Sequence, residues 1–268
     1  MLATSSGPVT LYPALTVEPH ATIAEFDTTH PDGADYVIVP AISRDDDPAM
    51  IAWLRNQAGK GATIDALVLP RRTARQAPVD PIRGDRRLVV GEEVATTTGI
   101  TASMPMALTL IEAIAGRQQA ARIAADIGLT HWDGRHASDA FRFDRGFALT
   151  AIGNTAAFWN REELGLELTP GVDEVSLALV ADAWSRTYRS RATTFTRGDG
   201  PVTTRHGVSV LPAQAAATWP AERLLPPVAD RPARALDDAL DGIGRRYGAA
   251  TARFVAMQLE YPRPDTSR

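Results

Sequence analysis

Two short apolar segments flanking one helical stretch constrain the fold of this chain more than any other feature. Residues 36–40 (Tyr-Val-Ile-Val-Pro) and 62–69 are rich in aliphatic and β-branched residues, as expected of strands buried on both faces. Between them, Asp47 can cap a helix that has Pro48 at its first position and ends near Gly59. A strand, a helix of this length and a second strand predict a parallel pair in an α/β protein.

Further elements extend this pattern in both directions. Strand-like residues are predicted within 9–17, where Pro13 interrupts them, and a hairpin is predicted from 88–90 and 94–96. Helices are predicted at 104–115, 120–127, 236–247 and 249–259. Residues 174–188 fit two structures: apolar residues alternate over 174–180 as in a strand, while Leu177, Val180, Trp184 and Tyr188 form a helical stripe. The proline-rich residues 213–234 are interpreted as a long loop.

One short segment recurs. Gly7-Pro-Val-Thr10 reappears as Gly200-Pro-Val-Thr203, and Val17 and Pro19 match Val210 and Pro212 at the same offsets. The pattern fits either an internal repeat or two similar strand–turn segments.

Composition narrows the class of protein. The 268 residues allow one large domain or two small ones, and a hydrophobic fraction of 44% with a charged fraction of 22% is ordinary for a globular protein. A formal net charge of −4 gives no electrostatic argument for binding nucleic acid, which requires a basic face. With no cysteine, disulfides, thiolate metal sites and thiol nucleophiles are excluded. No apolar run approaches the ~20 residues of a membrane span and residues 1–10 lack signal-peptide character, so we expect a cytoplasmic protein without membrane contact.

Four segments together resemble the ThiJ/PfpI superfamily, the class I glutamine amidotransferase-like proteins. They are residues 33–40, 46–54, 60–64 and, most distinctively, 96–116 (Thr-Thr-Thr-Gly-Ile-Thr-Ala-Ser-Met-Pro-Met-Ala-Leu and onward). The resemblance implies a flavodoxin-like α/β fold with a doubly wound, mostly parallel sheet in residues 1–145. Residues 146–268 then form an accessory α+β C-terminal half, possibly a degenerate repeat, similar to the C-terminal half of longer bacterial members.

The chain departs from the family where the family's chemistry lies. In the family, the strand equivalent to 62–69 leads into a nucleophile elbow that carries a cysteine, whereas here it leads into Leu69-Pro-Arg-Arg72. The family's first strand would precede Met1, so we expect an incomplete sheet whose open edge is either completed from the C-terminal half, with 174–180 as the candidate, or paired in a homo-oligomer. His131 lies after the 104–115 helix and does not match the family's histidine.

The resemblance therefore implies a truncated or degenerate member of the longer bacterial ThiJ/PfpI-domain proteins, which lacks the family nucleophile and is a non-catalytic, ligand-binding or regulatory protein. One alternative is an amidase- or hydrolase-like enzyme of the same class that uses water activated by Asp or His. A second alternative is a transcriptional regulator, although no helix-turn-helix with a basic recognition helix is present.

The candidate binding site is a turn before a helix. Gly99, Ile100, Thr101, Ala102 and Ser103 offer backbone amides at a helix N-terminus, where a small molecule or an anion can bind. Ser103 is expected to cap the helix of 104–115.

Other clusters of functional residue types are interpreted as ordinary polar surface, and we predict no metal, cofactor or catalytic residue. The first cluster, considered as metal ligands or as a catalytic triad, comprises His131, Asp133, His136, Ser138 and Asp139. The second, considered as a cation site, is Asp45–Asp47, and the third, considered as a nucleic-acid contact, is the set of arginines within 71–87.

Overall fold

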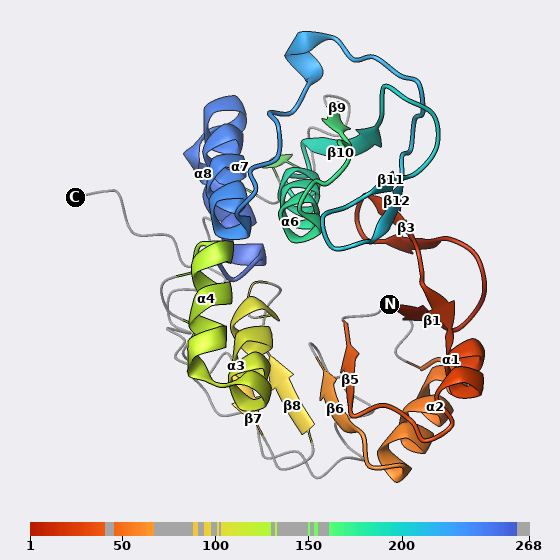
Figure 1. Cartoon of the computed structure of the whole chain (residues 1–268). Helices are drawn as coiled ribbons and strands as arrows, with labels where there is room; N and C mark the ends of the chain where they lie inside the picture. The colour runs from red at the N-terminus through yellow and green to blue at the C-terminus, as the bar shows by residue number, and fades with distance from the viewer. Residues whose placement is uncertain are drawn as a thin grey trace. The chain divides into compact units, whose positions relative to one another are not determined.

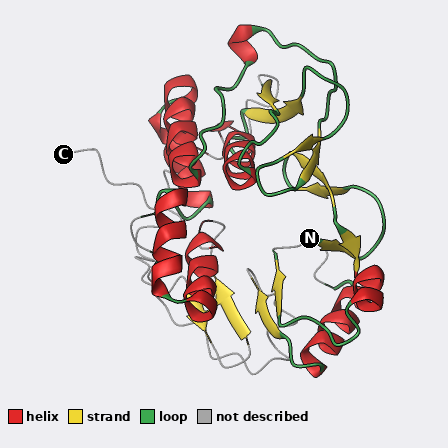
Figure 2. Ribbon diagram, viewed as in Figure 1, coloured by secondary structure: helices red, strands yellow, loops and turns green. Residues whose placement is uncertain are grey.

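The computed structural model describes residues 1–40, 46–66, 88–90, 94–97, 101, 103–129, 132, 150, 153–154 and 161–261 (Figures 1 and 2). This part of the chain is mixed α/β, with seven α-helices and with strands in both parallel and antiparallel pairs. It divides into two compact units, described separately below. Unit 1 takes its described residues from Met1–Ser6, His20–Arg122 and His131–Phe141, and unit 2 from Gly7–Pro19, Ile123–Thr130 and Arg142–Arg268.

The main sheet of unit 1 has the strand order β5-β6-β8-β7. Its strands are β5 (Tyr36–Val39), β6 (Thr63–Ala66), β7 (Leu88–Val90) and β8 (Val94–Thr97). β5 and β6 are parallel and are connected through α2 (Pro48–Gly59), while β7 and β8 form the antiparallel pair. The predicted strand–helix–strand unit and the predicted hairpin are thus confirmed, and residues 67–69 lie outside the described residues.

The start of α2 is the one that its sequence predicts. The Asp47 carboxylate accepts hydrogen bonds from the backbone N–H groups of Ala49 (2.9 Å) and Met50 (3.3 Å), and Pro48 occupies the first turn. A proline there loses no helical hydrogen bond, because the first N–H groups of a helix have no partner within it.

The prediction that residues 36–40 are buried on both faces is wrong. Tyr36 is 44% exposed and Ile38 is 51% exposed. Tyr36 and Ile38 point to the same face of β5, because residues two apart in a strand share a face, and the described residues leave that face uncovered.

The remaining elements of unit 1 are β1 (Leu2–Ala3), β4 (Ala21–Thr22), α1 (Ile23–Thr29), α3 (Ser103–Ala115) and α4 (Arg117–Ile127), whose last turns belong to unit 2. β1 and β4 pair in parallel. Asp27 on α1 accepts hydrogen bonds from Trp53 Nε1 and Gln57 Nε2 on α2, each at 3.0 Å, which fastens the two helices together.

Unit 2 contains a second parallel strand–helix–strand unit, formed by β9 (Glu162–Glu167), α6 (Glu174–Ser185) and β10 (Ser190–Phe195). α6 packs against α7 (Pro232–Tyr247), and α7 packs against α8 (Ala249–Gln258). The fully buried core side chains include Leu164, Leu166, Leu177, Phe195, Leu236, Leu240, Ile243 and Val255.

The helical alternative for residues 174–188 is correct and the strand alternative is wrong, so this segment does not complete a sheet. Asp173 caps α6 through a 2.7 Å hydrogen bond from the Ser176 N–H, and Leu177, Val180 and Trp184 are buried along one stripe. Tyr188 lies beyond the helix, with a φ of 61°.

The recurring segment folds into the same structure twice. β2 (Val9–Leu11) and β3 (Leu15–Glu18) form one hairpin, and β11 (Val202–Thr203) and β12 (Ser209–Leu211) form the other. The hairpins join through β3 and β12 into the order β11-β12-β3-β2, with Val9 opposite Val17, Val17 opposite Val210, and Val210 opposite Val202. The matching valines therefore occupy one row of a sheet with approximate two-fold symmetry.

Among the described residues, no helix combines the length and the apolar character needed to cross a membrane.

Candidate functional site

The candidate site lies where β9 and β10 of unit 2 end. Both strands run in the same direction, so their carboxyl ends meet at one edge, and the segments 168–173 and 196–201 leave the sheet there. In open α/β sheets, ligands bind outside the carboxyl ends of the strands, at the point where the strand order reverses.

A pocket of about 490 Å³ opens at this edge. It is a hollow open to solvent rather than an enclosed cavity. The pocket is lined by Glu167, Leu168, Thr169, Pro170, Thr196, Arg197, Gly198, Asp199, Pro201, Val202 and Thr203.

An ion pair joins the two strand ends at the pocket. Arg197 Nε lies 2.6 Å from Glu167 Oε1, and Arg197 Nη2 lies 3.2 Å from Glu167 Oε2, in a two-pronged geometry. The hydrogen bond to Glu167 raises the pKa of Arg197, so the guanidinium stays charged. Because the Arg197 side chain is 63% exposed, this charge is accessible to a ligand from solvent.

Backbone hydrogen bonds hold the two pocket walls together. The Gly171 N–H donates to the Thr203 carbonyl (2.9 Å), and the Arg205 N–H donates to the Val172 carbonyl (3.0 Å). The Leu168 N–H donates to the Phe195 carbonyl at 2.7 Å, which extends the strand pairing into the pocket. The pocket is therefore formed by backbone that is fixed on both sides.

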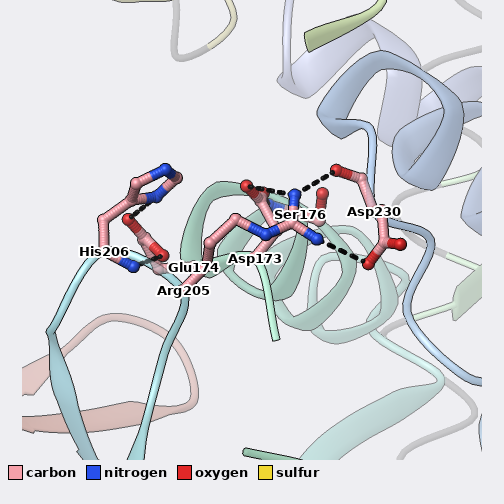
Figure 3. A network of polar contacts seen from close by, with 6 residues as sticks. All are labelled: Asp173, Glu174, Ser176, Arg205, His206 and Asp230. Atoms are coloured by element: carbon pink, nitrogen blue, oxygen red, sulfur yellow. Dashed lines mark hydrogen bonds and ion pairs between the residues drawn. The ribbon is translucent and has the colours of Figure 1, made fainter. Parts of the chain in front are cut away.

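A polar network fastens the β11–β12 turn to the start of α6, as Figure 3 shows. Arg205 Nη2 lies 3.0 Å from Asp230 Oδ1, and Arg205 Nη1 lies 4.0 Å from Asp173 Oδ2. His206 Nδ1 lies 2.7 Å from Glu174 Oε1. Since Thr203 lines the pocket two residues before Arg205, the network stabilises one pocket wall.

Glu174 is held in its charged form by this network. Burial raises the pKa of Glu174, but hydrogen bonds from its own backbone and from His206 outweigh the burial and place the pKa below its usual value. Asp173, Glu174 and His206 have ligand atoms within 4.8 Å of one another, as a cation site requires. However, Asp173 already caps α6 and faces Arg205, so we interpret the cluster as a set of contacts that stabilise the fold.

The predicted binding turn of unit 1 is described only in part. Thr101 is buried, and Ser103 is the first residue of α3, one residue before the predicted start of that helix. Gly99, Ile100 and Ala102 lie outside the described residues, so an anion or small-molecule site at this turn stays a prediction.

The other sequence candidates are also largely outside the described part of the chain. His131, Asp133, His136, Ser138 and Asp139 lie outside it, as do Asp45 and the arginine-rich residues 71–87.

Sequence reasoning missed the pocket because it did not identify β9. The signal was present: Leu164, Leu166 and Leu168 alternate with polar residues or glycine, as in a strand with one buried face. A strand ending there, followed by a capped helix, would have directed attention to the carboxyl edge of β9.

Comparisons with known proteins add little. No family model matches the chain, and no curated protein matches it. A solved structure that matches is that of oxidized DJ-1 from Toxoplasma gondii, at 20% sequence identity and a TM-score of 0.41, over 48% of this chain and 82% of that one. A likeness this slight assigns neither a family nor a function.

Proposed function

We propose that this protein is a non-catalytic, ThiJ/PfpI-like protein that binds a small polar molecule at the carboxyl ends of β9 and β10. The observation that carries the proposal is the pocket of about 490 Å³, whose walls are fixed by backbone hydrogen bonds and whose rim carries an exposed, charged arginine.

The flavodoxin-like part of the proposal has two supports. The segments that resemble the ThiJ/PfpI superfamily include β5, α2 and β6, and these form a parallel strand–helix–strand unit. A second such unit, β9-α6-β10, occurs in the other half of the chain. Doubly wound folds are built from units of this kind.

The pocket residues favour a ligand that carries both charges. Arg197 donates hydrogen bonds to Glu167 from Nε and Nη2. The two N–H groups of Nη1 can donate to the carboxylate of a ligand. Glu167 and Asp199 supply negative charge for an amine, and Thr169 and Thr203 supply hydroxyl groups. Free amino acids combine a carboxylate and an amine in one small molecule, and we propose this class of ligand.

The absence of cysteine supports a non-catalytic assignment. No thiolate exists at any pH, so the purified protein is expected to show no glyoxalase-like, amidase-like or isonitrile hydratase-like activity that depends on a thiol. Robust turnover of such substrates, abolished by an inhibitor of that activity, would contradict the assignment.

The binding proposal is tested by isothermal titration of the full chain with a panel of free amino acids. We expect saturable binding by at least one of them, and Arg197→Gln should weaken it by about tenfold or more, because a charge-assisted hydrogen bond to the carboxylate is lost. Arg234→Gln is the matched control, since Arg234 is a 72% exposed arginine of α7 that does not line the pocket. No binding, or equal losses in the two variants, would overturn the proposal.

A further inference from the structure

The loop between α6 and β10 is held in a conformation that is unfavourable for one of its residues. Tyr188 has a φ of 61°, in the left-handed region that residues other than glycine rarely adopt. Thr187 Oγ1 accepts hydrogen bonds from the backbone N–H groups of Arg189 (3.0 Å) and Ser190 (2.9 Å). The same hydroxyl donates to the Trp184 carbonyl at 3.0 Å. These contacts fix the backbone of the loop, and backbone strain that is fixed in this way is typical of ligand sites.

This loop lies beside the start of α8. Asn154 Nδ2 donates to the Thr187 carbonyl at 3.0 Å and to Thr251 Oγ1, in the first turn of α8, at 3.4 Å. The N-cap residue of α8, Gly248, provides no side-chain cap. The first N–H groups of a helix need partners from outside it, and they form the positive end of the helix dipole. The loop therefore lies next to backbone donors that favour an anion.

Arg189, in the same loop, is partly buried and has no counter-ion in the part of the chain that the structure describes. Its Cζ lies over the ring of Tyr247, 5.1 Å from the ring centroid. Its Nε is buried and has no hydrogen-bond partner, and no described carboxylate lies within 4.0 Å of the guanidinium. Because a partly buried charge is stabilised by an ion of opposite sign, an anion bound at Arg189 would be favourable.

The nearby carboxylate of Glu162 is already occupied. Its Oε2 pairs with Arg246 Nη2, and its Oε1 accepts a hydrogen bond from the Tyr247 hydroxyl at 3.3 Å. Arg246 also lies over the Tyr247 ring, with Cζ 5.9 Å from the centroid. The last turn of α7 contains Arg245 and Arg246, so the negative end of that helix has cations of its own. Of the two guanidinium groups at the Tyr247 ring, the one of Arg189 is therefore left for a ligand.

We propose that the loop before β10 and the start of α8 form a second binding site, which takes a phosphate group and has Arg189 as its principal residue. The site lies at the amino end of β10, whereas the pocket described above lies at its carboxyl end. The planar guanidinium can donate to two phosphate oxygens, and a third oxygen can accept from the N–H groups of Ala249 and Ala250 at the uncapped helix start. A carboxylate has only two oxygens, so a phosphate satisfies more of these donors.

The probe is inorganic phosphate, added to the isotopically labelled full chain at neutral pH and constant ionic strength while backbone amide chemical shifts are recorded. We expect saturable shifts at Tyr188, Arg189, Ala249 and Ala250. Arg189→Gln should weaken phosphate binding by about tenfold or more, because charge-assisted hydrogen bonds are lost. Acetate should bind the wild type more weakly than phosphate by about fivefold or more, because it lacks the third oxygen.

Two further variants separate binding at Arg189 from general effects of charge and folding. Arg191→Gln is the matched control, since Arg191 is an exposed arginine two residues further along β10, and it should leave phosphate binding unchanged. Arg189→Lys keeps the charge but not the planar donor group, so its affinity should lie between those of the wild type and Arg189→Gln, and it keeps the proposal testable if Arg189→Gln does not fold. Absent saturable shifts, shifts confined to the pocket at the carboxyl end, equal losses in the two glutamine variants, or equal affinity for acetate and phosphate would overturn the proposal.

Discussion

Gly242 and Gly244 lie in the same helix, α7, but meet different surroundings. Residues two apart in an α-helix point to nearly opposite sides. A Cβ atom built on Gly242 would lie 2.9 Å from Trp184 Cζ2, whereas one built on Gly244 would have its nearest neighbour, Ala252 Cβ, at 3.7 Å. The two positions therefore separate the backbone effect of alanine from its packing effect.

The two substitutions are expected to change the free energy of unfolding by different amounts. Replacing glycine by alanine inside a helix stabilises it by about 1 kcal/mol, and Gly244→Ala should gain about that amount because 3.7 Å is ordinary contact. At Gly242 the same gain is opposed by overpacking of about 1–3 kcal/mol. Trp184 is only 4% exposed and its ring meets Tyr247 edge-on at 6.2 Å, so it has little room to move. Gly242→Ala should thus be less stable than Gly244→Ala by about 1–3 kcal/mol.

Urea denaturation followed by far-ultraviolet circular dichroism measures both variants against the wild type. Because the chain has two units, the transition that contains α7 is identified by hydrogen exchange of its amides. If Gly242→Ala stabilised α7 as much as Gly244→Ala does, the close packing of Trp184 on Gly242 would be refuted.

Three further variants test local parts of the structure. Asp173→Ala should cost about 1 kcal/mol in unfolding free energy and Asp173→Asn much less, because asparagine keeps the cap acceptor of α6; equal losses would contradict the cap. The pKa of Glu174 is lowered in the folded protein, so its stabilising effect is present above its ordinary value of 4.5 and is lost as the pH falls through the folded-state pKa. Glu174→Gln should therefore destabilise near neutral pH and not in strong acid, and a pH-independent difference in urea midpoints would oppose this. Because Ser103 is the first residue of α3 rather than the residue before it, Ser103→Ala should cost less than the ~1 kcal/mol expected for Asp173→Ala, and an equal loss would show that Ser103 acts as the cap.

Local signals in the sequence predicted the elements whose formation depends on adjacent residues. Asp47 and Pro48 suffice to start α2, because the hydrogen bonds of a helix start are made within four residues. The recurring Gly-Pro-Val-Thr segment likewise matched real strands, because the valine row of the two hairpins follows from a constant offset.

Features that depend on distant residues could not be predicted in this way. Both patterns were present over 174–180, and only packing against α7, together with the Asp173 cap, selects the helix. The apolar residues of β5 predicted burial, but burial of a strand face depends on which elements pack against that face, and this is decided elsewhere in the chain. The pocket combines the ends of β9 and β10 with the β11–β12 hairpin, a juxtaposition that no local pattern encodes.

The location of ligand binding is the most direct test of the proposed function. Backbone amide chemical shifts of the isotopically labelled full chain are recorded while the tightest-binding amino acid of the panel is added. The account predicts saturable shifts at pocket residues of unit 2, including Thr169, Gly198 and Thr203. Shifts confined to Thr101 and Ser103 would place the ligand at the turn before α3 instead, and the absence of any saturable shift would contradict a binding function for the pocket.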